Sequence, residues 1–383
     1  MKIGIVCYPT FGGSGVIATE LGMGLARKGH QVHFITSERP VRLSSFQDNV
    51  YFHEVSSRSY PLFQHTPYET ALASKLVDVV SHEGIDILHV HYAIPHAAVA
   101  YMAKQILHSK GYTIPVVTTL HGTDITLVGS DKSFAPVVEF SINNSDGVTA
   151  VSNHLKQQTL DAFNITSDIR VIYNFIDFDR FKKTDKEHFK KAIAPEGEKI
   201  IVHTSNFRKV KRVQDVIKVF ANVQAEIPAK LLLIGDGPER QSLEVLCREM
   251  GLCDEIRFLG KQNAVEELLS LADLFIIPSQ NESFGLAALE AMACEVPIIS
   301  SDVGGLPEVN ITGITGYTCG LGDIKAMSIG ALKILQDPAL HNEMKQNALK
   351  RAQEFSIDNV LPVYEEYYLH LIKKLKPNLQ SIS

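Results

Sequence analysis

Short apolar, β-branched runs alternate with helical patterns in both halves of the sequence. Runs of this length are typical of parallel strands buried on both faces. Consecutive strand–helix–strand units are right-handed and build open, doubly wound sheets. The predicted strands are residues 2–8, 31–36, 87–90, 116–120, 147–151 and 169–172, followed by 200–204, 230–234, 256–259, 274–278 and 297–301.

The alternation breaks in a charged and turn-forming stretch at residues 178–198. A chain of 383 residues is also longer than one hydrophobic core usually serves. We therefore expect an α/β protein with two Rossmann-like, doubly wound domains, one at residues 1–180 and one at 181–356. Residues 357–383 are expected to form a C-terminal helix that packs back on the N-terminal domain, followed by a tail.

Composition excludes several classes of protein. The chain has 37 Lys and Arg against 43 Asp and Glu, a net charge of −6, which argues against nucleic-acid binding. Its apolar runs are strand-sized, so we expect no membrane span, and we read no export signal at the N-terminus. The cysteines are scattered without a CxxC pair, as expected for buried thiols in a reducing cytoplasm. We expect a cytoplasmic protein with small-molecule substrates; a homo-oligomer is left open.

A glycine-rich loop follows the first predicted strand and opens a helix. Gly12, Gly13, Ser14 and Gly15 could form a backbone cradle for an anion at the helix N-terminus, or simply a tight turn that needs glycine. The loop also matches the alanine form of the dinucleotide fingerprint, with Glu38 as a ribose-binding carboxylate. An NAD(P)-dependent oxidoreductase is therefore an alternative.

A second segment, residues 278–290, follows a predicted buried strand and enters a helix. Glu282 and Glu290 are eight residues apart, slightly over two helical turns, which would place both carboxylates on one side of a helix. Ser283 or Glu282 can cap this helix, and Gly285 allows close backbone approach. Sugar hydroxyls are suitable donors to such carboxylates. The alternative is an N-cap glutamate followed by an exposed helical glutamate.

This segment resembles the E-x7-E signature of the retaining GT-B glycosyltransferases of family 4. Further matches follow in the same order along nearly the whole chain, at residues 12–15, 121–124, 173–177, 211, 235–238 and 304–308. The resemblance implies a GT-B fold, in which two Rossmann-like domains face each other across a cleft. It also implies that the N-terminal domain binds the acceptor and the C-terminal domain binds the nucleotide sugar.

Within this family, residues 7–15 and 205–208 are similar to the branch that transfers GlcNAc from UDP-GlcNAc to L-malate in bacillithiol biosynthesis. The resemblance implies these two substrates, retention of the α configuration and no cofactor. A family-4 enzyme that uses an inositol phosphate or a lipid acceptor is one alternative. A non-catalytic sugar-binding protein is another.

The resemblance also implies roles for individual residues. Lys211 would neutralise the departing diphosphate, His121 would face the donor sugar, and Glu282 would complete the catalytic set. Most of the family has arginine where this chain has Asn206, so Arg208 or Arg212 is the candidate for the missing charge. The expected donor-binding residues are Asn206, Arg208, Ser283, Phe284, Gly285, Leu286 and Glu290. The expected acceptor-binding residues are Gly12, Gly13, Ser14, Gly15, Arg58 and Tyr92.

Two patterns could suggest a metal ion, and neither leads us to predict one. Asp177 and Asp179 formally match a D-x-D motif, but they align with a family loop that is not a metal site. His89, His91 and His96 lie close in sequence without a neighbouring cysteine or carboxylate ligand, so a role for His91 in lining the site is favoured over coordination.

Overall fold

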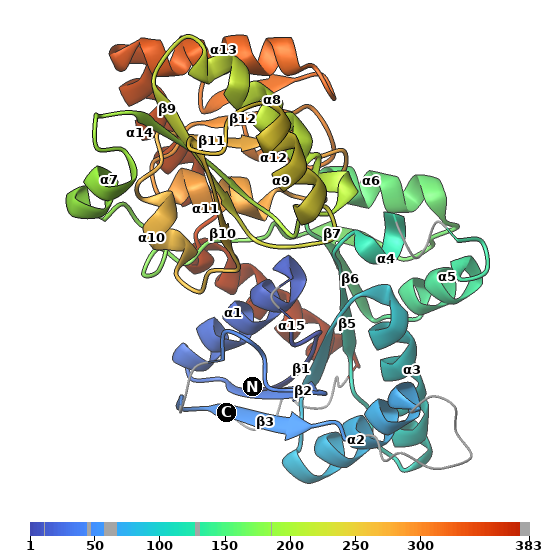
Figure 1. Cartoon of the computed structure of the whole chain (residues 1–383). Coiled ribbons are helices and arrows are strands. Elements are labelled where there is room, and N and C mark those ends of the chain that lie inside the picture. Colours follow the sequence, from blue (N-terminus) through green and yellow to red (C-terminus); the bar gives the residue numbers. More distant parts are fainter. Residues whose placement is uncertain (11, 44–46, 57–66, 127–130, 185, 376–383) are drawn as a thin grey trace. The chain divides into compact units, whose positions relative to one another are not determined.

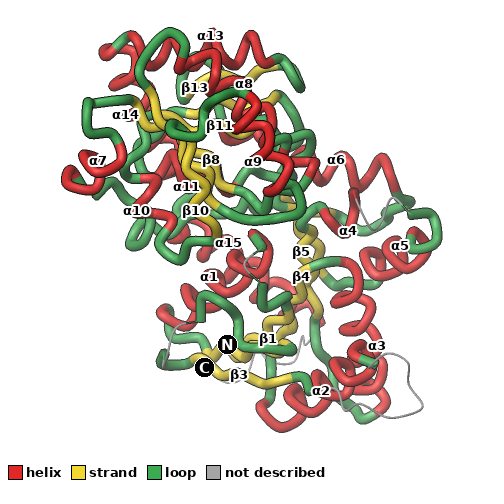
Figure 2. Tube along the Cα trace, in the orientation of Figure 1, coloured by secondary structure: helices red, strands yellow, loops and turns green. Residues whose placement is uncertain are grey.

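The computed structural model describes residues 1–10, 12–43, 47–56, 67–126, 131–184 and 186–375. The chain divides into two compact units, and each is a parallel sheet with helices packed against it (Figures 1 and 2). The first unit comprises Met1–Asn174 and Ile357–Ser383, and the second comprises Phe175–Ser356.

The first unit contains a seven-stranded sheet in the order β3-β2-β1-β4-β5-β6-β7, with all neighbours parallel. The strand β3 was not predicted from the sequence, because it is an edge strand whose side chains are all at least partly exposed and it lacks the continuous apolar run of a central strand. The strands are β1 (Lys2–Val6), β2 (Gln31–Thr36), β3 (Val50–Glu54), β4 (Ile87–His91), β5 (Val116–Leu120), β6 (Gly147–Ala150) and β7 (Ile169–Val171).

The last helix, α15, belongs to the first unit although it ends the described chain. It packs on α1, where a Cβ added at Gly24 would lie 3.0 Å from both Ile357 and Leu361. Lys28 forms an ion pair with Glu365 at 2.7 Å. The helices of this unit are α1 (Gly13–Arg27), α2 (Tyr68–Glu83), α3 (Ala98–Ser109), α4 (Thr123–Thr126), α5 (Ala135–Asn143), α6 (Asn153–Ala162) and α15 (Ile357–Leu375), with a π-helical turn at Ala93–Ala97.

The second unit contains a six-stranded parallel sheet in the order β10-β9-β8-β11-β12-β13. Its helices include α8, whose buried face packs on the sheet in a core of aliphatic and phenylalanine side chains. The strands are β8 (Lys199–Thr204), β9 (Ala229–Ile234), β10 (Ile256–Gly260), β11 (Leu274–Ile277), β12 (Ile298–Ser301) and β13 (Gly316–Cys319). The helices are α7 (Glu187–Ile193), α8 (Val213–Gln224), α9 (Arg240–Glu249), α10 (Val265–Leu269), α11 (Leu286–Ala293), α12 (Leu306–Val309), α13 (Ile324–Gln336) and α14 (Pro338–Glu354), with a 3₁₀ turn at Lys209–Lys211.

Residues just after Asn174 pack with the second unit. Phe175 and Phe181 are buried, and the backbone amide of Ile176 donates to the carbonyl of Phe355 at 2.9 Å. The boundary expected at residue 180 therefore lies just inside the second unit. None of the described helices has both the length and the apolar character needed to cross a membrane.

Strand order identifies the edge of each sheet where a ligand would bind. In the first unit the order reverses between β1 and β4, and in the second between β8 and β11. In open α/β sheets, ligands bind outside the carboxyl ends of the strands at this switch point. The loops that follow these four strands carry most of the site residues expected from the sequence.

Candidate functional site

The glycine loop of the first unit is held by close contact with the backbone before it. The helix α1 begins at Gly13, and its N-cap, Gly12, provides no side-chain cap. A Cβ added at Gly15 would lie 2.4 Å from the carbonyl oxygen of Tyr8 and 2.7 Å from that of Thr10, so only glycine fits there. The amides of the first turn have no acceptor within the helix and are oriented to bind a negative group.

Ser14 and Tyr92 bring the two switch-point loops of the first unit together. The hydroxyl of Tyr92 donates to Oγ of Ser14 at 2.6 Å. Tyr92 has a φ of 85°, a left-handed conformation that costs about 1–3 kcal/mol in a residue with a side chain. Burial raises the pKa of Tyr92 to about 12, so this side chain is a neutral hydrogen-bonding group at physiological pH. Its backbone amide donates to the carbonyl of Thr119 at 2.9 Å, which fixes the strained turn.

His121 lies directly after β5 and contacts a second histidine. Its Nε2 is 2.8 Å from Nδ1 of His91, the last residue of β4. Burial lowers the pKa of His121 to about 3 and lowers that of His91 well below its usual range. Both rings are therefore neutral at physiological pH, and His121 can exchange hydrogen bonds with a sugar hydroxyl but cannot act there as a cation.

Asp124 is a positioning residue, although the sequence pointed to it only as part of the motif at residues 121–124. Its carboxylate accepts hydrogen bonds from the amide of Ala93 at 2.9 Å and from the amide of Gly122 at 3.0 Å. It thereby ties the loop after β4 to the loop that carries His121. Burial raises the pKa of Asp124 to about 6 although these amides oppose the shift. The signal in the sequence was an acidic residue three positions after a strand-end histidine.

In the second unit, a charged pair joins the two switch-point loops. Nζ of Lys211, after β8, lies 2.5 Å from Oε1 of Glu282, after β11. Oγ of Ser279 donates to the same carboxylate oxygen at 3.0 Å. The backbones of the two loops also meet, because the amide of Gln280 donates to the carbonyl of Val210 at 2.7 Å. Lys211 is thus held at the carboxyl edge of the sheet by an acidic partner that the sequence placed in the same site.

The glycines at residues 304 and 305 let a third loop approach this segment. A Cβ added at Gly304, which has a φ of 60°, would lie 2.0 Å from the carbonyl oxygen of Glu282. The amide of Gly305 donates to that same carbonyl at 2.8 Å. The backbone around Glu282 is therefore fixed by the loop after β12, and these glycines act through chain packing.

The expected helical relation between Glu282 and Glu290 is wrong. The helix α11 begins at Leu286, so Glu282 precedes it in a loop and only Glu290 is helical. The N-cap of α11 is Gly285, with a φ of 99° and no side-chain cap, so neither Ser283 nor Glu282 caps the helix. Gly285 has a left-handed backbone, which glycine adopts without a Cβ clash. The helix therefore starts only at the next residue, Leu286.

The charges around Asn206 differ in their partners. Arg212 has a left-handed backbone and its Nε lies 2.5 Å from a carboxylate oxygen of Asp215, in the first turn of α8. Arg208 is exposed and forms no ion pair with any residue the structure describes. Asn206 is exposed at the end of β8. Of the two candidates for the missing arginine charge, Arg208 is the one without an ion-pair partner among the described residues.

Comparison with known proteins identifies the family. The description "Glycosyltransferase Family 4" matches residues 11–180, and "Glycosyl transferases group 1" matches residues 184–351. The chain is 49% identical over 375 residues to N-acetyl-alpha-D-glucosaminyl L-malate synthase of Bacillus anthracis. The aligned region covers 97% of this chain and 98% of the relative. The chain belongs to glycosyltransferase family 4.

Solved structures give the fold of this glycosyltransferase. Sucrose-phosphate synthase from Thermosynechococcus elongatus matches with a TM-score of 0.80 and 21% identity, over 98% of this chain and 100% of the other. HepE of Anabaena, solved with UDP and glucose, matches with a TM-score of 0.80 and 20% identity, over 96% and 99% of the two chains. The GT-B fold expected from the sequence is confirmed, and the oxidoreductase alternative is not favoured.

The structure brings the expected residues of this glycosyltransferase together in two groups, one in each unit. Gly12, Gly13, Ser14, Gly15 and Tyr92 share the switch point of the first sheet, with His121 on the adjacent strand end. The switch point of the second sheet holds Lys211, Glu282 and the start of α11. Arg58, expected to contact the acceptor, lies outside the described residues.

Proposed function

We propose that this glycosyltransferase transfers GlcNAc from UDP-GlcNAc to the hydroxyl of L-malate with retention of the α configuration, the first step of bacillithiol biosynthesis. The observation that carries the proposal is the 49% identity, over 97% of this chain, to a relative whose name states both the sugar and the acceptor. A relationship over this length favours the same acceptor over an inositol phosphate or a lipid. A cytoplasmic location agrees with the free cysteines found among the described residues.

We place the donor on the second unit. The carboxylate of Glu290 would accept hydrogen bonds from the ribose hydroxyls, and the first amides of α11 would meet the diphosphate. Lys211 and the exposed Arg208 supply the positive charge. Because Lys211 is already held by Glu282 at 2.5 Å, its ammonium is positioned before the reaction starts. Pre-positioned charge is the form of electrostatic stabilisation that contributes most to catalysis.

We place the acceptor on the first unit. Malate carries two carboxylates at neutral pH, whereas the chain has a net charge of −6, so the attraction must be local. The first-turn amides of α1 supply that attraction. Ser14 accepts a hydrogen bond from Tyr92 and can donate its own proton to a carboxylate oxygen.

The reaction needs position and charge more than covalent chemistry. The acceptor hydroxyl attacks the anomeric carbon from the side on which the diphosphate leaves. The new C–O bond forms as the sugar–phosphate bond breaks, and the departing phosphate takes the hydroxyl proton. Lys211 stabilises the charge that develops on this phosphate. His121, neutral because burial lowers its pKa to about 3, orients the donor sugar through hydrogen bonds.

We further propose that turnover requires no divalent metal ion, because Lys211 and the amides of α11 do the work of a cation at the diphosphate. Turnover should survive EDTA when it is measured at temperatures below the thermal unfolding transition. Loss of activity that Mn²⁺ restores would instead favour Asp177 and Asp179 as ligands.

The test of the proposed function is turnover with a panel of acceptors. UDP-GlcNAc is supplied with L-malate, D-malate, L-lactate or inositol 3-phosphate, and UDP release is measured. We expect release with L-malate and a product whose NMR coupling shows the α anomer. Release of UDP only with inositol 3-phosphate would make that compound the acceptor in place of L-malate. Sugar binding with no UDP release under any condition would indicate a non-catalytic protein.

A further inference from the structure

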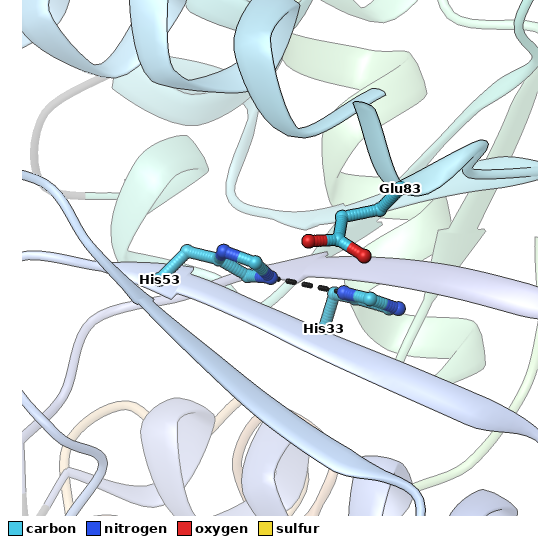
Figure 3. A group of neighbouring side chains, drawn as sticks. All are labelled: His33, His53 and Glu83. Carbon is cyan, nitrogen blue, oxygen red and sulfur yellow. Dashed lines mark hydrogen bonds between the residues drawn. The ribbon is translucent and has the colours of Figure 1, made fainter. Parts of the chain in front are cut away.

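A cluster of possible metal ligands lies in the first unit, on the edge of the sheet. His33 on β2, His53 on β3 and Glu83 at the end of α2 each offer one ligand atom, and these atoms lie within 4.8 Å of one another. Figure 3 shows the carboxylate of Glu83 pointing toward the two imidazole rings, which lie side by side. Among the residues described, no other group of this kind is found.

The pairing register explains why the two rings meet. On adjacent parallel strands, His33 is opposite Tyr51, and His53 is opposite Ile35. The histidines are therefore diagonal neighbours on the same face, a separation that ring side chains can bridge. Nδ1 of His33 lies 2.9 Å from Nε2 of His53. The rings are nearly parallel, with centroids 5.2 Å apart.

Hydrogen bonding alone leaves this pair incompletely satisfied. His33 is buried, with 1% of its surface exposed, and its Nε2 has no hydrogen-bond partner in the described part of the chain. Two neutral imidazoles share only one proton across their contact. The far nitrogen of His33, Nε2, points away from His53 and Glu83 (Figure 3), so an ion in the cluster would be bound by the two nitrogens that now face each other, Nδ1 of His33 and Nε2 of His53.

The carboxylate of Glu83 supplies the negative charge of the cluster. Glu83 is the last residue of the 16-residue helix α2, where unpaired carbonyls give a partial negative charge. Around the cluster, Glu83 and Asp78 are acidic and Lys2 and Lys75 are basic. The ammonium of Lys2 donates to the carbonyl oxygen of Glu83 at 2.7 Å.

We propose that His33, His53 and Glu83 bind one Zn²⁺ ion, with water as the fourth ligand, and that this ion ties the edge strand β3 to β2 and α2. Two nitrogens and one carboxylate oxygen form a donor set that suits zinc. Tetrahedral zinc with bonds of about 2.0–2.1 Å separates two ligand nitrogens by roughly 3.3 Å, so binding requires the nitrogens, now 2.9 Å apart and facing each other, to move apart and both rings to turn toward the ion. The proton now shared between the rings moves to the far nitrogen of the histidine that donates it, and none is lost.

The site is separate from the groups assigned to sugar transfer. His33 is the third residue of β2 and His53 the fourth of β3, whereas the proposed substrate groups follow the ends of the strands. The role we infer is structural, since an ion here joins three elements and includes an edge strand. The test therefore measures binding and needs no enzyme activity.

Full-length protein is stripped with EDTA, dialysed against one equivalent of ZnCl₂ and analysed for bound metal. We expect one zinc per chain, four-coordinate absorption bands when Co²⁺ replaces zinc, and a thermal midpoint that rises with zinc concentration. His53→Gln and Glu83→Gln should each reduce zinc affinity at least tenfold. Both side chains are partly exposed, so these variants should fold, which circular dichroism can verify.

The matched control is His82→Gln, which removes the exposed histidine next to Glu83 and should leave zinc binding unchanged. Zinc retained by His53→Gln with wild-type affinity would overturn the proposal. So would failure of the wild-type chain to bind zinc stoichiometrically, or equal loss in the His82→Gln control.

Discussion

The two units share a strand order but differ in how they build their switch points. In the first unit, the contacts at the site join neutral groups, the buried pair of His91 and His121 and the half-buried pair of Tyr92 and Ser14. In the second, a charged pair of Lys211 and Glu282 joins the loops. One topology therefore supports two kinds of site, a hydrogen-bonding one in the first unit and a charged one in the second. Under the proposed function, the first suits the hydroxyl and carboxylates of an acceptor, and the second suits a diphosphate leaving group.

Acidification should separate the units most strongly. Five buried histidines of the first unit have lowered pKa values because of burial, against one buried histidine in the second. Their folded pKa values lie below the unfolded value, so their contribution to stability is present above pH 6.5 and is lost as pH falls toward 4. Each imidazole that the fold holds neutral at pH 5 lowers the free energy of unfolding by about 2 kcal/mol relative to pH 6.5. The residues are His33, His89, His91, His96 and His121 in the first unit and His203 in the second.

Hydrogen exchange measured at pH 7.5 and pH 5.0, corrected for intrinsic rates, checks this prediction. Amides of β4 and β5 should lose protection by a larger factor than those of β8 and β11. Equal loss in both units, or earlier loss in the second, would contradict the contrast drawn between them.

Removing the cation of the second unit should affect catalysis next most strongly. Lys211→Ala should lower kcat roughly 10²–10³-fold, because one pre-positioned group that stabilises transition-state charge is lost. Lys209→Ala is the control, since Lys209 is exposed in the same 3₁₀ turn and should leave kcat close to that of the wild type. A similar loss in both variants would mean that general positive charge, not the Glu282 pair, is what matters.

Asp124 is the group of the first site that should titrate between pH 4 and pH 7. Burial raises its pKa to about 6 from 3.8, so the fold favours the protonated form and this contribution to stability is lost as pH rises through 6. Relative to Asp124→Asn, which does not titrate, the wild-type chain should lose up to roughly 3 kcal/mol of unfolding free energy between pH 4 and pH 7. Denaturant unfolding of both proteins at each pH gives the difference, and a difference independent of pH would show that Asp124 stays ionised.

The prediction from sequence succeeded where the signal was local and failed where it depended on contacts between distant segments. Alternating apolar runs predicted the central strands because both faces of those strands are buried. The edge strand β3 lacked that run. Placing Glu282 and Glu290 on one helix failed because the left-handed Gly285 delays the start of α11. Asp124 and His91 were not assigned a positioning role because their partners come from loops that meet only in the folded sheet.

Under the proposed function, the first unit binds the acceptor and the second unit binds the donor. The most direct test is UDP affinity by calorimetry together with the KM for L-malate, in Gly13→Val and Glu290→Gln. Gly13→Val should raise the malate KM at least tenfold or abolish turnover while UDP affinity stays within about twofold of the wild type. Glu290→Gln should weaken UDP binding by roughly 1–3 kcal/mol, because a ribose contact is lost. If Gly13→Val instead lost UDP affinity and kept its malate response, the division of substrates between the two units would be wrong.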